Sequence, residues 1–248
     1  MAMRQIKATM PVAAPEIVSM SGVRFAWPGR DSFRLVIDDF TLRQGERVLL
    51  IGPSGGGKST FLSLLAGITT PQAGSISILG TDIAAMRGAA RDRFRARHFG
   101  IIFQMFNLLP YGSAIDNVLL PLSFSSERRQ RAAAKGSADE EAARLLAILG
   151  IEPGLMRASA ARLSVGQQQR VAAARALIGA PQIIIADEPT SALDRNLQGA
   201  FLDLLFAVVA DAGATLIMVS HDESLAPRFS RVVPLESIAR VERGEARR

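Results

Sequence analysis

The 248-residue sequence contains no cysteine, which excludes disulfide bridges, thiolate metal sites and a cysteine nucleophile. It also has no run near the ~18 consecutive apolar residues that a membrane-spanning helix needs, and its N-terminus lacks the apolar segment of a signal peptide. These absences lead us to expect a soluble, cytoplasmic protein. Any work at a membrane would then need a second polypeptide to supply the membrane span.

The net charge is +6, from 29 Lys and Arg against 23 Asp and Glu. This balance is compatible with an anionic ligand, a nucleic acid, a membrane surface or simply a solubilising surface, and it does not choose among them. The composition, 48% apolar and 21% charged, is typical of a globular chain, and the length fits one large domain or two small ones. We expect residues 1–16 to form a disordered extension.

The order of predicted elements indicates an α/β fold. Two alternating segments, 17–27 and 33–42, flank a Pro-Gly-Arg-Asp turn and predict a hairpin. The runs 183–185 and 216–219 are nearly all apolar, which is typical of a parallel sheet buried on both faces. Between them and the earlier strands, Ala, Leu, Arg and Glu with helical spacing predict a helical insertion at about 104–180. The other predicted strands are 47–51, 75–79, 100–103, 182–186, 215–220 and 231–235, and the predicted helices are 58–66, 84–97 and 196–210.

A glycine-rich loop joins the strand 47–51 to the helix that begins at Lys58. It fits the pattern G-x-x-x-x-G-K-S without a mismatch. Glycines let backbone N–H groups surround a phosphate at a helix N-terminus, Lys58 supplies positive charge, and the Ser59 hydroxyl can ligate Mg²⁺. A flexible turn is a poor alternative between an apolar strand and a helix. The predicted nucleotide-binding residues are Gly52, Pro53, Ser54, Gly55, Gly56, Gly57, Lys58, Ser59 and Thr60.

Two carboxylates, Asp187 and Glu188, follow the apolar strand 182–186. Successive strand residues point to opposite sides, so the two acids need not share a role. We expect Asp187 to bind Mg²⁺ together with Ser59, and Glu188 to orient or deprotonate an attacking water. The alternative is a solvated strand end, which the upstream phosphate loop makes less attractive.

The order of these motifs resembles that of the ATP-binding cassette (ABC) ATPases. The stretch LSVGQ at 163–167 is similar to the LSGGQ signature of that family. Gln104 matches the Q-loop, Asp194 the D-loop and His221 the switch histidine. The resemblance implies one cassette at 17–248, with a P-loop NTPase core, a mostly parallel sheet, an N-terminal antiparallel β subdomain and an inserted α-helical subdomain.

The resemblance also implies a mechanism. Two copies would pair head to tail as a homodimer, so that each ATP lies between the phosphate loop of one copy and the signature of the other, and hydrolysis would release the pair. ATP and Mg²⁺ are thus the expected substrate and cofactor. The expected signature contacts are Ser164 (also a helix N-cap), Val165, Gly166 and Gln167; the catalytic residues are Glu188, His221 and Gln104; the Mg²⁺ ligands are Ser59, Gln104 and Asp187.

Two aromatic residues compete for the adenine contact. Val23, Phe25 and Trp27 alternate and therefore share one face of the first predicted strand. The family has an aromatic side chain near this place that stacks on adenine, and Trp27 is similar in position to its usual tyrosine. We favour Trp27 for stacking through the face of its ring, and Phe25 for the core.

The signature departs from the family at Val165, where glycine is usual. Glycine tolerates positive φ and close backbone approach, and a β-branched residue tolerates neither well. We hypothesise that Val165 loosens the nucleotide contact or slows turnover. The second histidine, His98, lies in a basic segment without an evident partner, and we assign it a structural role.

The segments 106–111 and 116–122 resemble the branch of the family that serves lipoprotein release, macrolide efflux and cell division. That branch drives separate transmembrane permeases, so we expect the chain at the inner face of the cell membrane, attached through such a partner. A permease contact by the apolar residues of 106–111 is favoured over a core role.

A second function class stays open, a soluble ABC ATPase that acts in repair, translation or assembly. Translation members usually carry two cassettes, and repair members carry a long coiled coil for which the gap from Gln104 to Ser164 is too short. A P-loop kinase would have no reason for LSVGQ. The basic segment 84–97 is compatible with nucleic acid, but we favour a solvated face and expect no nucleic-acid partner. Its arginines are Arg87, Arg91, Arg93, Arg95 and Arg97.

Overall fold

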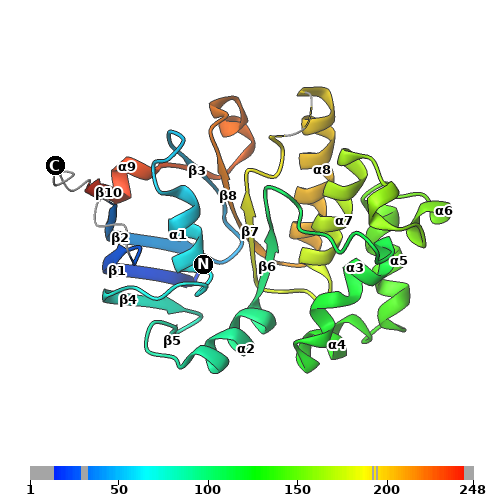
Figure 1. Cartoon of the computed structure of the whole chain (residues 1–248), viewed down its shortest axis with the longest axis horizontal. Helices are drawn as coiled ribbons and strands as arrows, with labels where there is room; N and C mark the ends of the chain where they lie inside the picture. The colour runs from blue at the N-terminus through cyan, green and yellow to red at the C-terminus, as the bar shows by residue number, and fades with distance from the viewer. Residues whose placement is uncertain (1–13, 29–32, 192, 194, 243–248) are drawn as a thin grey trace, which may run out of the picture.

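Helix α1 (Lys58–Leu65) lies between two five-stranded sheets (Figure 1). The structure is a computed structural model that describes residues 14–28, 33–191, 193 and 195–242. The helix buries Phe61 and Leu65 in a core that also holds Met20 of one sheet and Ile217 of the other. Because both sheets pack against the helix, they fix the position of the residues where the phosphate loop joins α1.

The first sheet is antiparallel and has the strand order β10-β2-β1-β4-β5. The predicted hairpin partners pair, with Phe25 opposite Leu35. The sequence does not predict β5 or β10, because strands of 2 and 4 residues are too short to show alternation. The strands are β1 (Glu16–Ala26), β2 (Arg34–Arg43), β4 (Ala73–Ile78), β5 (Thr81–Asp82) and β10 (Ala239–Glu242).

Strand β1 begins one residue before the predicted start. Glu16 pairs with Arg43, and the carbonyl oxygen of Pro15 accepts a 2.9 Å hydrogen bond from the backbone N–H of Gln44. Pairing with β2 therefore orders the last residues of the predicted extension. The rest of that extension, 1–13, lies outside the described residues, as do residues 29–31 of the turn predicted at 28–31.

The second sheet is parallel throughout and has the order β6-β7-β8-β3-β9. The pleat sends Ile183 and Ile185 into the core around α1, and Ile184 and Ala186 into a second core beneath the other helices. This sheet is therefore buried on both faces, as its apolar strands predict. The strands are β3 (Arg47–Ile51), β6 (Phe99–Ile102), β7 (Ile183–Asp187), β8 (Thr215–Ser220) and β9 (Arg231–Pro234).

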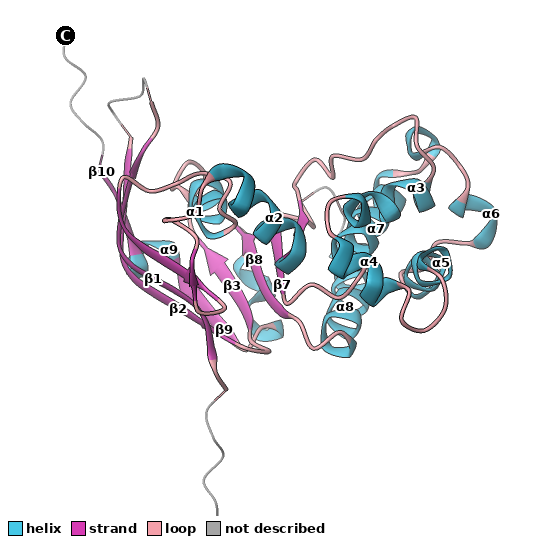
Figure 2. Ribbon diagram, turned by 90° about the horizontal axis from the view of Figure 1, so that it is seen from below, coloured by secondary structure: helices cyan, strands magenta, loops and turns pink. Residues whose placement is uncertain are grey.

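The helical insertion lies on the other side of β6 and β7 from α1 (Figures 1 and 2). Over the described ranges, no helix combines the length and apolar character needed to cross a bilayer. The helices between β6 and β7 are α3 (Ala114–Leu119), α4 (Ser126–Ala132), α5 (Ala138–Ile148), α6 (Pro153–Met156) and α7 (Val165–Leu177), with 3₁₀ turns at Leu120–Ser123 and Ala160–Arg162. The remaining helical elements are α2 (Gly88–His98), α8 (Arg195–Asp211), the 3₁₀ turn Glu223–Arg228 and α9 (Leu235–Ile238).

Arg128 of α4 fastens the insertion to the parallel sheet. Its side chain is buried, and its guanidinium donates to the carbonyl oxygens of Phe99 (2.9 Å), Ala176 (3.0 Å) and Ile178 (2.9 Å). Burial lowers the pKa of Arg128 to about 10. The group therefore stays charged at neutral pH and holds β6 and the end of α7 together. With this insertion, the parallel core and the antiparallel sheet, the predicted fold class is confirmed.

The basic helix predicted at 84–97 is shorter at its N-terminal end. The backbone N–H of Ala84 donates to the carboxylate of Asp82 (3.0 Å), and Arg87 is an N-cap with extended backbone, so α2 starts only at Gly88. His98, at the other end, has partners that the sequence does not reveal. Its Nδ1 lies 3.0 Å from Oε1 of Gln182, and its ring packs on Phe94.

The last predicted strand also ends early. The range 231–235 becomes β9 up to Pro234, and Leu235 begins the short helix α9. The chain then turns into β10, where Val241 pairs with Leu35. The C-terminal part of the described chain thus runs from β9 of the parallel sheet to β10 of the antiparallel sheet. It connects the two sheets that pack against α1.

Candidate active site

The phosphate loop wraps the N-terminus of α1. Gly55 and Gly57 have φ angles of 73° and 98°, which favour glycine, and a Cβ on Gly56 would lie 2.9 Å from the carbonyl oxygen of Pro53. No side chain caps α1, and no acidic residue lies in its first turn. The free N–H groups and the positive end of the helix dipole are thus left for an anion.

Lys58 holds its charge inside the loop. The side chain is buried, and its Nζ donates to the carbonyl oxygens of Gly52 (2.8 Å) and Pro53 (3.0 Å). Its only described ion pair is with Oε1 of Glu188 at 3.6 Å. Neutral carbonyls orient the ammonium group without neutralising it, so it keeps most of its attraction for phosphate.

Glu188 links β7 to the end of β8. Its φ of 44° is unusual for a residue other than glycine. Hydrogen bonds hold this geometry: the backbone N–H of Glu188 donates to Val219 (3.0 Å), and the Ser191 hydroxyl donates to the Glu188 carbonyl (3.0 Å). Oε2 of the side chain lies 2.9 Å from Nδ1 of His221. Two residues that are 33 positions apart in the sequence are thus brought together.

Asp187 is the last residue of β7, and its surroundings shift the pKa of its carboxyl group. Burial raises the pKa of the Asp187 carboxyl, and the charge of Glu188 acts in the same direction. A hydrogen bond from Ser59 and the charge of Lys58 oppose this rise. A half-buried carboxylate with an adjacent hydroxyl is a group that a cation would stabilise.

One open cavity of about 740 Å³ brings most of the predicted nucleotide-site residues together. It also contains Phe33, which the sequence does not single out because Phe33 follows the turn without any motif. Gly52 and Pro53 do not line the cavity, but they accept hydrogen bonds from Lys58, which does. Similarly, His221 pairs with Glu188, which lines the cavity. The predicted residues that line the cavity are Trp27, Ser54, Gly55, Gly57, Lys58, Ser59, Thr60, Gln104, Asp187 and Glu188.

Trp27 and Phe25 take different positions. Phe25 is buried in the core, and its ring meets that of Trp27 edge to face with 4.9 Å between centroids. Trp27 is partly exposed, lines the cavity, and donates through Nε1 to the hydroxyl of Thr60 (3.3 Å). With its N–H bonded to Thr60 and its ring packed against Phe25, Trp27 is held at the cavity, where an aromatic ring can stack on a base.

The signature segment, 163–167, lies outside the cavity, at the N-terminus of α7. Ser164 is the N-cap: its hydroxyl accepts from the backbone N–H of Gln167 (3.3 Å), and the Gln167 side chain accepts from the backbone N–H of Ser164 (2.9 Å). This reciprocal capping box fixes the first turn of α7. The cap predicted for Ser164 is therefore present.

One of the two grounds for the hypothesis on Val165, the need for a positive φ, does not hold. Val165 is the first residue of α7, and it is not among the described residues with positive φ, so its backbone does not need glycine. Its side chain is 50% exposed at the helix N-terminus. Only the bulk of the side chain, and not backbone conformation, is left to hinder a partner. Asp194, the predicted D-loop residue, lies outside the described residues.

The residues present fit Mg²⁺ only in company with a nucleotide. No group of three or more His, Asp or Glu in the described part of the chain could hold a metal by itself. Ser59, Gln104 and Asp187 do line one cavity. Mg²⁺ is usually held by one or two carboxylates together with phosphate oxygens and waters. The donor set is therefore suited to a nucleotide-bound Mg²⁺.

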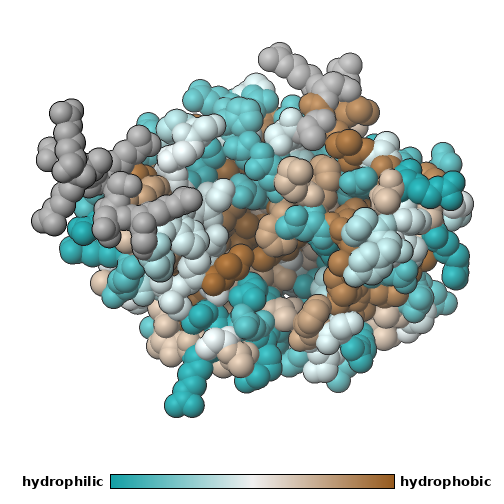
Figure 3. Space-filling model, viewed as in Figure 1, coloured by the Kyte–Doolittle hydropathy of each residue, from teal (hydrophilic) through white to brown (hydrophobic). Residues whose placement is uncertain are grey.

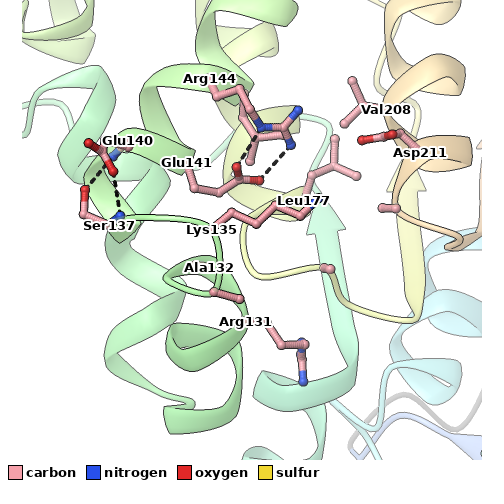
Figure 4. A pocket seen from close by; sticks show the side chains of 14 residues that line it. Arg131, Ala132, Lys135, Ser137, Glu140, Glu141, Arg144, Leu177, Val208 and Asp211 are labelled. Carbon is pink, nitrogen blue, oxygen red and sulfur yellow. Dashed lines mark hydrogen bonds and ion pairs between the residues drawn. The ribbon is translucent and has the colours of Figure 1, made fainter.

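A second hollow, of about 450 Å³, lies between α4, α5 and the end of α8 (Figure 4). Its charges mostly satisfy one another. Arg144 forms two hydrogen bonds with Glu141 (2.7 and 2.8 Å), and Glu140 caps α5 through Ser137. Asp211 faces Arg144 from α8 (Figure 4). None of the predicted site residues lines this hollow, so it does not compete as the active site.

Sequence comparisons identify the family to which the chain belongs. A protein-family model described as ABC transporter matches residues 37–191. The chain is 42% identical over 199 residues to YbbA of Escherichia coli, an uncharacterized ABC transporter ATP-binding protein, which covers 79% of this chain and 83% of the relative. It is 39% identical over 204 residues to the lipoprotein-releasing system ATP-binding protein LolD of Chromohalobacter salexigens, covering 80% and 81%.

Solved structures give the same result. The ATP-binding cassette MJ0796, a dimer in a post-hydrolysis state bound to ADP and Pi, superposes with a TM-score of 0.73 and 32% sequence identity, covering 87% of this chain and 93% of that one. CbiO1 of Clostridium perfringens, part of the ABC transporter complex CbiONQ, superposes with a TM-score of 0.70 and 27% identity, covering 86% and 81%.

Proposed function

Because this chain belongs to the ABC transporter family and is an ATP-binding subunit that hydrolyses ATP, we propose that it works as a homodimer that drives a separate membrane permease. The observation that carries this proposal is the cavity beside α1, where Lys58, Asp187 and Glu188 converge. The residues of the signature lie elsewhere, at the N-terminus of α7. Such a division of the site calls for a second copy.

The exposed N-terminus of α7 supports a site shared between two copies. A helix N-terminus with its Ser164 cap presents donors and positive potential to an anion. In the described part of a single chain, this end does not line the cavity. Head-to-tail pairing with two-fold symmetry would place it over the phosphates bound by the partner. The MJ0796 cassette bound to ADP and Pi is a dimer.

The chemistry follows from the side chains that the cavity gathers. Lys58 and the N–H groups at the start of α1 attract the phosphates and offset the charge that grows on them as the terminal phosphate leaves. Glu188 orients a water molecule for attack and takes up its proton, while His221 holds the carboxylate from the other side. When bound by Ser59, Gln104 and Asp187, Mg²⁺ would supply positive charge to the phosphate oxygens.

An exposed apolar surface near Gln104 supports the permease partner. Met105 and Tyr111 are 80% and 82% exposed, although both are large apolar or aromatic side chains. Of the apolar residues predicted there, Phe106 is instead buried in the core. Hydrophobic surface also gathers along the middle of the molecule and over its helical half (Figure 3). Such patches mark interaction sites.

A groove next to this surface has the shape for a partner segment. It holds about 490 Å³ between α2, β6 and the 3₁₀ turn Leu120–Ser123. Its apolar lining residues are Ala96, Phe99, Ile101, Phe103, Leu120, Pro121, Phe124 and Ala176. A permease that docks there would stand beside Gln104 and place the chain at the inner face of the cell membrane. The LolD relative, named for a lipoprotein-releasing system, agrees with this branch.

Affinity purification from membranes tests the proposed partner. A Glu188→Gln variant should retain ATP in the closed dimer and stay attached to the permease, so that a protein with several membrane spans is recovered when ATP is present. Lys58→Ala, which weakens ATP binding, is the matched control and should recover less of it. Recovery of only soluble proteins or nucleic acid would favour the second function class and overturn the proposal.

The contact surface can be tested separately. Replacing Leu109 and Tyr111 by alanine should weaken permease binding more than ATP binding, because neither residue lines the nucleotide cavity. Ile148→Ala, which removes an exposed apolar side chain from α5, is the control. Equal losses of permease and ATP binding would instead mean that these residues serve the core.

A further inference from the structure

The loop after β6 carries Gln104 into the nucleotide cavity in an uncommon conformation. Phe106 and Asn107 are both left-handed, with φ angles of 58° and 48°. Two consecutive residues of this kind are unfavourable without glycine, more for a phenylalanine than for an asparagine. Within the loop, the backbone N–H of Phe106 donates to Phe103 (3.0 Å) and that of Asn107 donates to Met105 (2.6 Å). Contacts with other elements must supply the rest of the stabilisation.

One contact comes from the signature helix. Arg175 of α7 donates through one guanidinium nitrogen to the carbonyl oxygen of Asn107 (2.6 Å) and through the other to that of Phe106. The two left-handed residues present neighbouring carbonyls to a single planar group, which suits the fork of an arginine and not the point charge of a lysine. This contact joins residues that are 68 and 69 positions apart.

The burial of Arg175 argues against an incidental contact. The residue is 7% exposed, and burial lowers its pKa. No described carboxylate forms an ion pair with it, so backbone carbonyls are the partners of the charge. A buried cation without a counter-ion is expensive, and the fold keeps it here at a turn that follows Gln104 by two residues.

The far end of the same loop is fastened independently. Asn117 of α3 is fully buried; its side chain accepts from the backbone N–H of Leu109 (2.7 Å) and donates to the carbonyl oxygen of Leu109 (3.1 Å). Asn117 therefore holds the loop to α3, whereas Arg175 holds it to α7, the helix that begins with the signature. Only the second fastening joins Gln104 to the element that meets the partner copy.

We propose that Arg175 is a positioning residue: by binding the carbonyls of Phe106 and Asn107, it holds the loop in the shape that keeps Gln104 in the nucleotide cavity and ties this residue to α7. The inference rests on the role proposed above for Gln104. It goes further by assigning a function to an arginine that touches neither the nucleotide cavity nor the signature segment.

Arg175→Lys tests this role, with Arg175→Met as a second variant that removes the charge. Arg170→Lys is the matched control, because Arg170 lies on the same helix and donates to carbonyls of Leu149 (3.2 Å) and Gly150 (3.3 Å), away from the loop. Hydrogen exchange of peptides spanning 103–109 should be faster in both Arg175 variants and unchanged in Arg170→Lys. Unchanged exchange in the Arg175 variants would overturn the proposal.

Steady-state kinetics provides the second readout, at temperatures below the unfolding midpoint of each variant. Arg175→Lys should lower kcat by about tenfold with little change in the KM for ATP. In a Gln104→Ala background the same change should have little further effect, because Arg175 acts through Gln104. Equal losses in both backgrounds would mean a merely structural role and overturn the proposal. A Gln104→Ala variant with normal kcat would instead remove the proposed role of Gln104, so the two failures are distinguishable.

Discussion

At the scale of single residues, the site depends on side chains whose environment differs from what their identity suggests. Glu188 occupies a backbone region that glycine favours, and Asp187 beside it is half-buried with a raised pKa. The last residue of β7 and the residue after it thus place their carboxylates in different surroundings: Asp187 beside Ser59, and Glu188 between Lys58 and His221. Glu188 suits the handling of water and protons, and Asp187 suits a cation.

Val165 gives a prediction at this scale. Its backbone is helical, so any hindrance comes from the branched side chain at the exposed end of α7. Both Val165→Gly and Val165→Ala should raise kcat for ATP hydrolysis by about threefold, because a smaller residue allows closer approach to the partner's nucleotide. The alanine variant separates this effect from the lower helix propensity of glycine. An unchanged or lower rate in both variants would refute the hypothesis.

At the scale of elements, helix ends recur with different uses. Ser164 and Ser137 form the same capping box, at the start of α7 and α5 respectively. Of these two helices, only α7 is expected to contact a nucleotide. The start of α1, by contrast, has no capping side chain. The two capped helices can therefore be compared: removing either cap should lower stability, but only the cap of α7 should affect nucleotide binding.

The two boxes form a matched pair of variants. Ser164→Ala and Ser137→Ala should each lower the free energy of unfolding by about 1 kcal/mol, since each removes one N-cap hydrogen bond. Urea unfolding measures this loss. The ATPase rate should fall only for Ser164→Ala, because Ser137 is remote from the nucleotide. A similar rate for the two variants would argue against the role proposed for the signature.

His98 joins α2 to the segment before β7 and makes stability depend on pH. Burial lowers its pKa below the ordinary 6.5; Arg97 and Arg131 act the same way, and the hydrogen bond to Gln182 and the charge of Glu127 oppose it. The unfolded chain therefore binds this proton more tightly. Stability is present in full above pH 6.5 and is lost as the pH falls through the folded-state pKa.

The expected result is a difference between two urea-unfolding series. Between about pH 7.5 and about pH 5.5, the midpoint of the wild-type chain should fall more than that of His98→Gln, because the variant has no imidazole to protonate. Parallel curves over this range would mean that His98 does not contribute to the pH dependence.

At the scale of the whole molecule, the sequence predicts the architecture well because its signals are local. Each signal lies within about ten residues: the alternation in β1, the apolar runs in β7 and β8, and the glycine-rich loop before α1. The order of motifs singles out Lys58, Glu188 and His221, but the contacts of Glu188 with the other two residues are seen only in the structure.

Other features could not be predicted, because distant contacts decide them. Arg175 stands in an alanine-rich helix and has the sequence pattern of a surface arginine, yet its partners lie 68 and 69 residues away. Phe33 reaches the cavity only because β2 pairs with β1. Strand β10 depends on the chain returning to β2 after more than 190 residues, and its four residues have no pattern of their own.

A nucleotide site shared between two copies, as proposed above, would have a consequence for mixtures of variants. Lys58→Ala disables the phosphate loop. Gly166→Asp should disable the signature through repulsion of phosphate, while the fold tolerates it: a Cβ at Gly166 meets only Leu193 at 3.8 Å, and an acid suits a helix N-terminus. In a head-to-tail heterodimer of the two, one site combines both defects. The other site combines an intact phosphate loop with an intact signature.

ATPase complementation between these two inactive variants therefore tests the shared site most directly. Mixed in equal amounts, Lys58→Ala and Gly166→Asp should regain about a quarter of the wild-type rate, because half of the dimers are mixed and each holds one intact site. Lys58→Ala mixed with Glu188→Gln should regain nothing, since every site then carries a defect. Failure of the first mixture to regain activity, with both variants folded and dimeric, would contradict a nucleotide site shared between two copies.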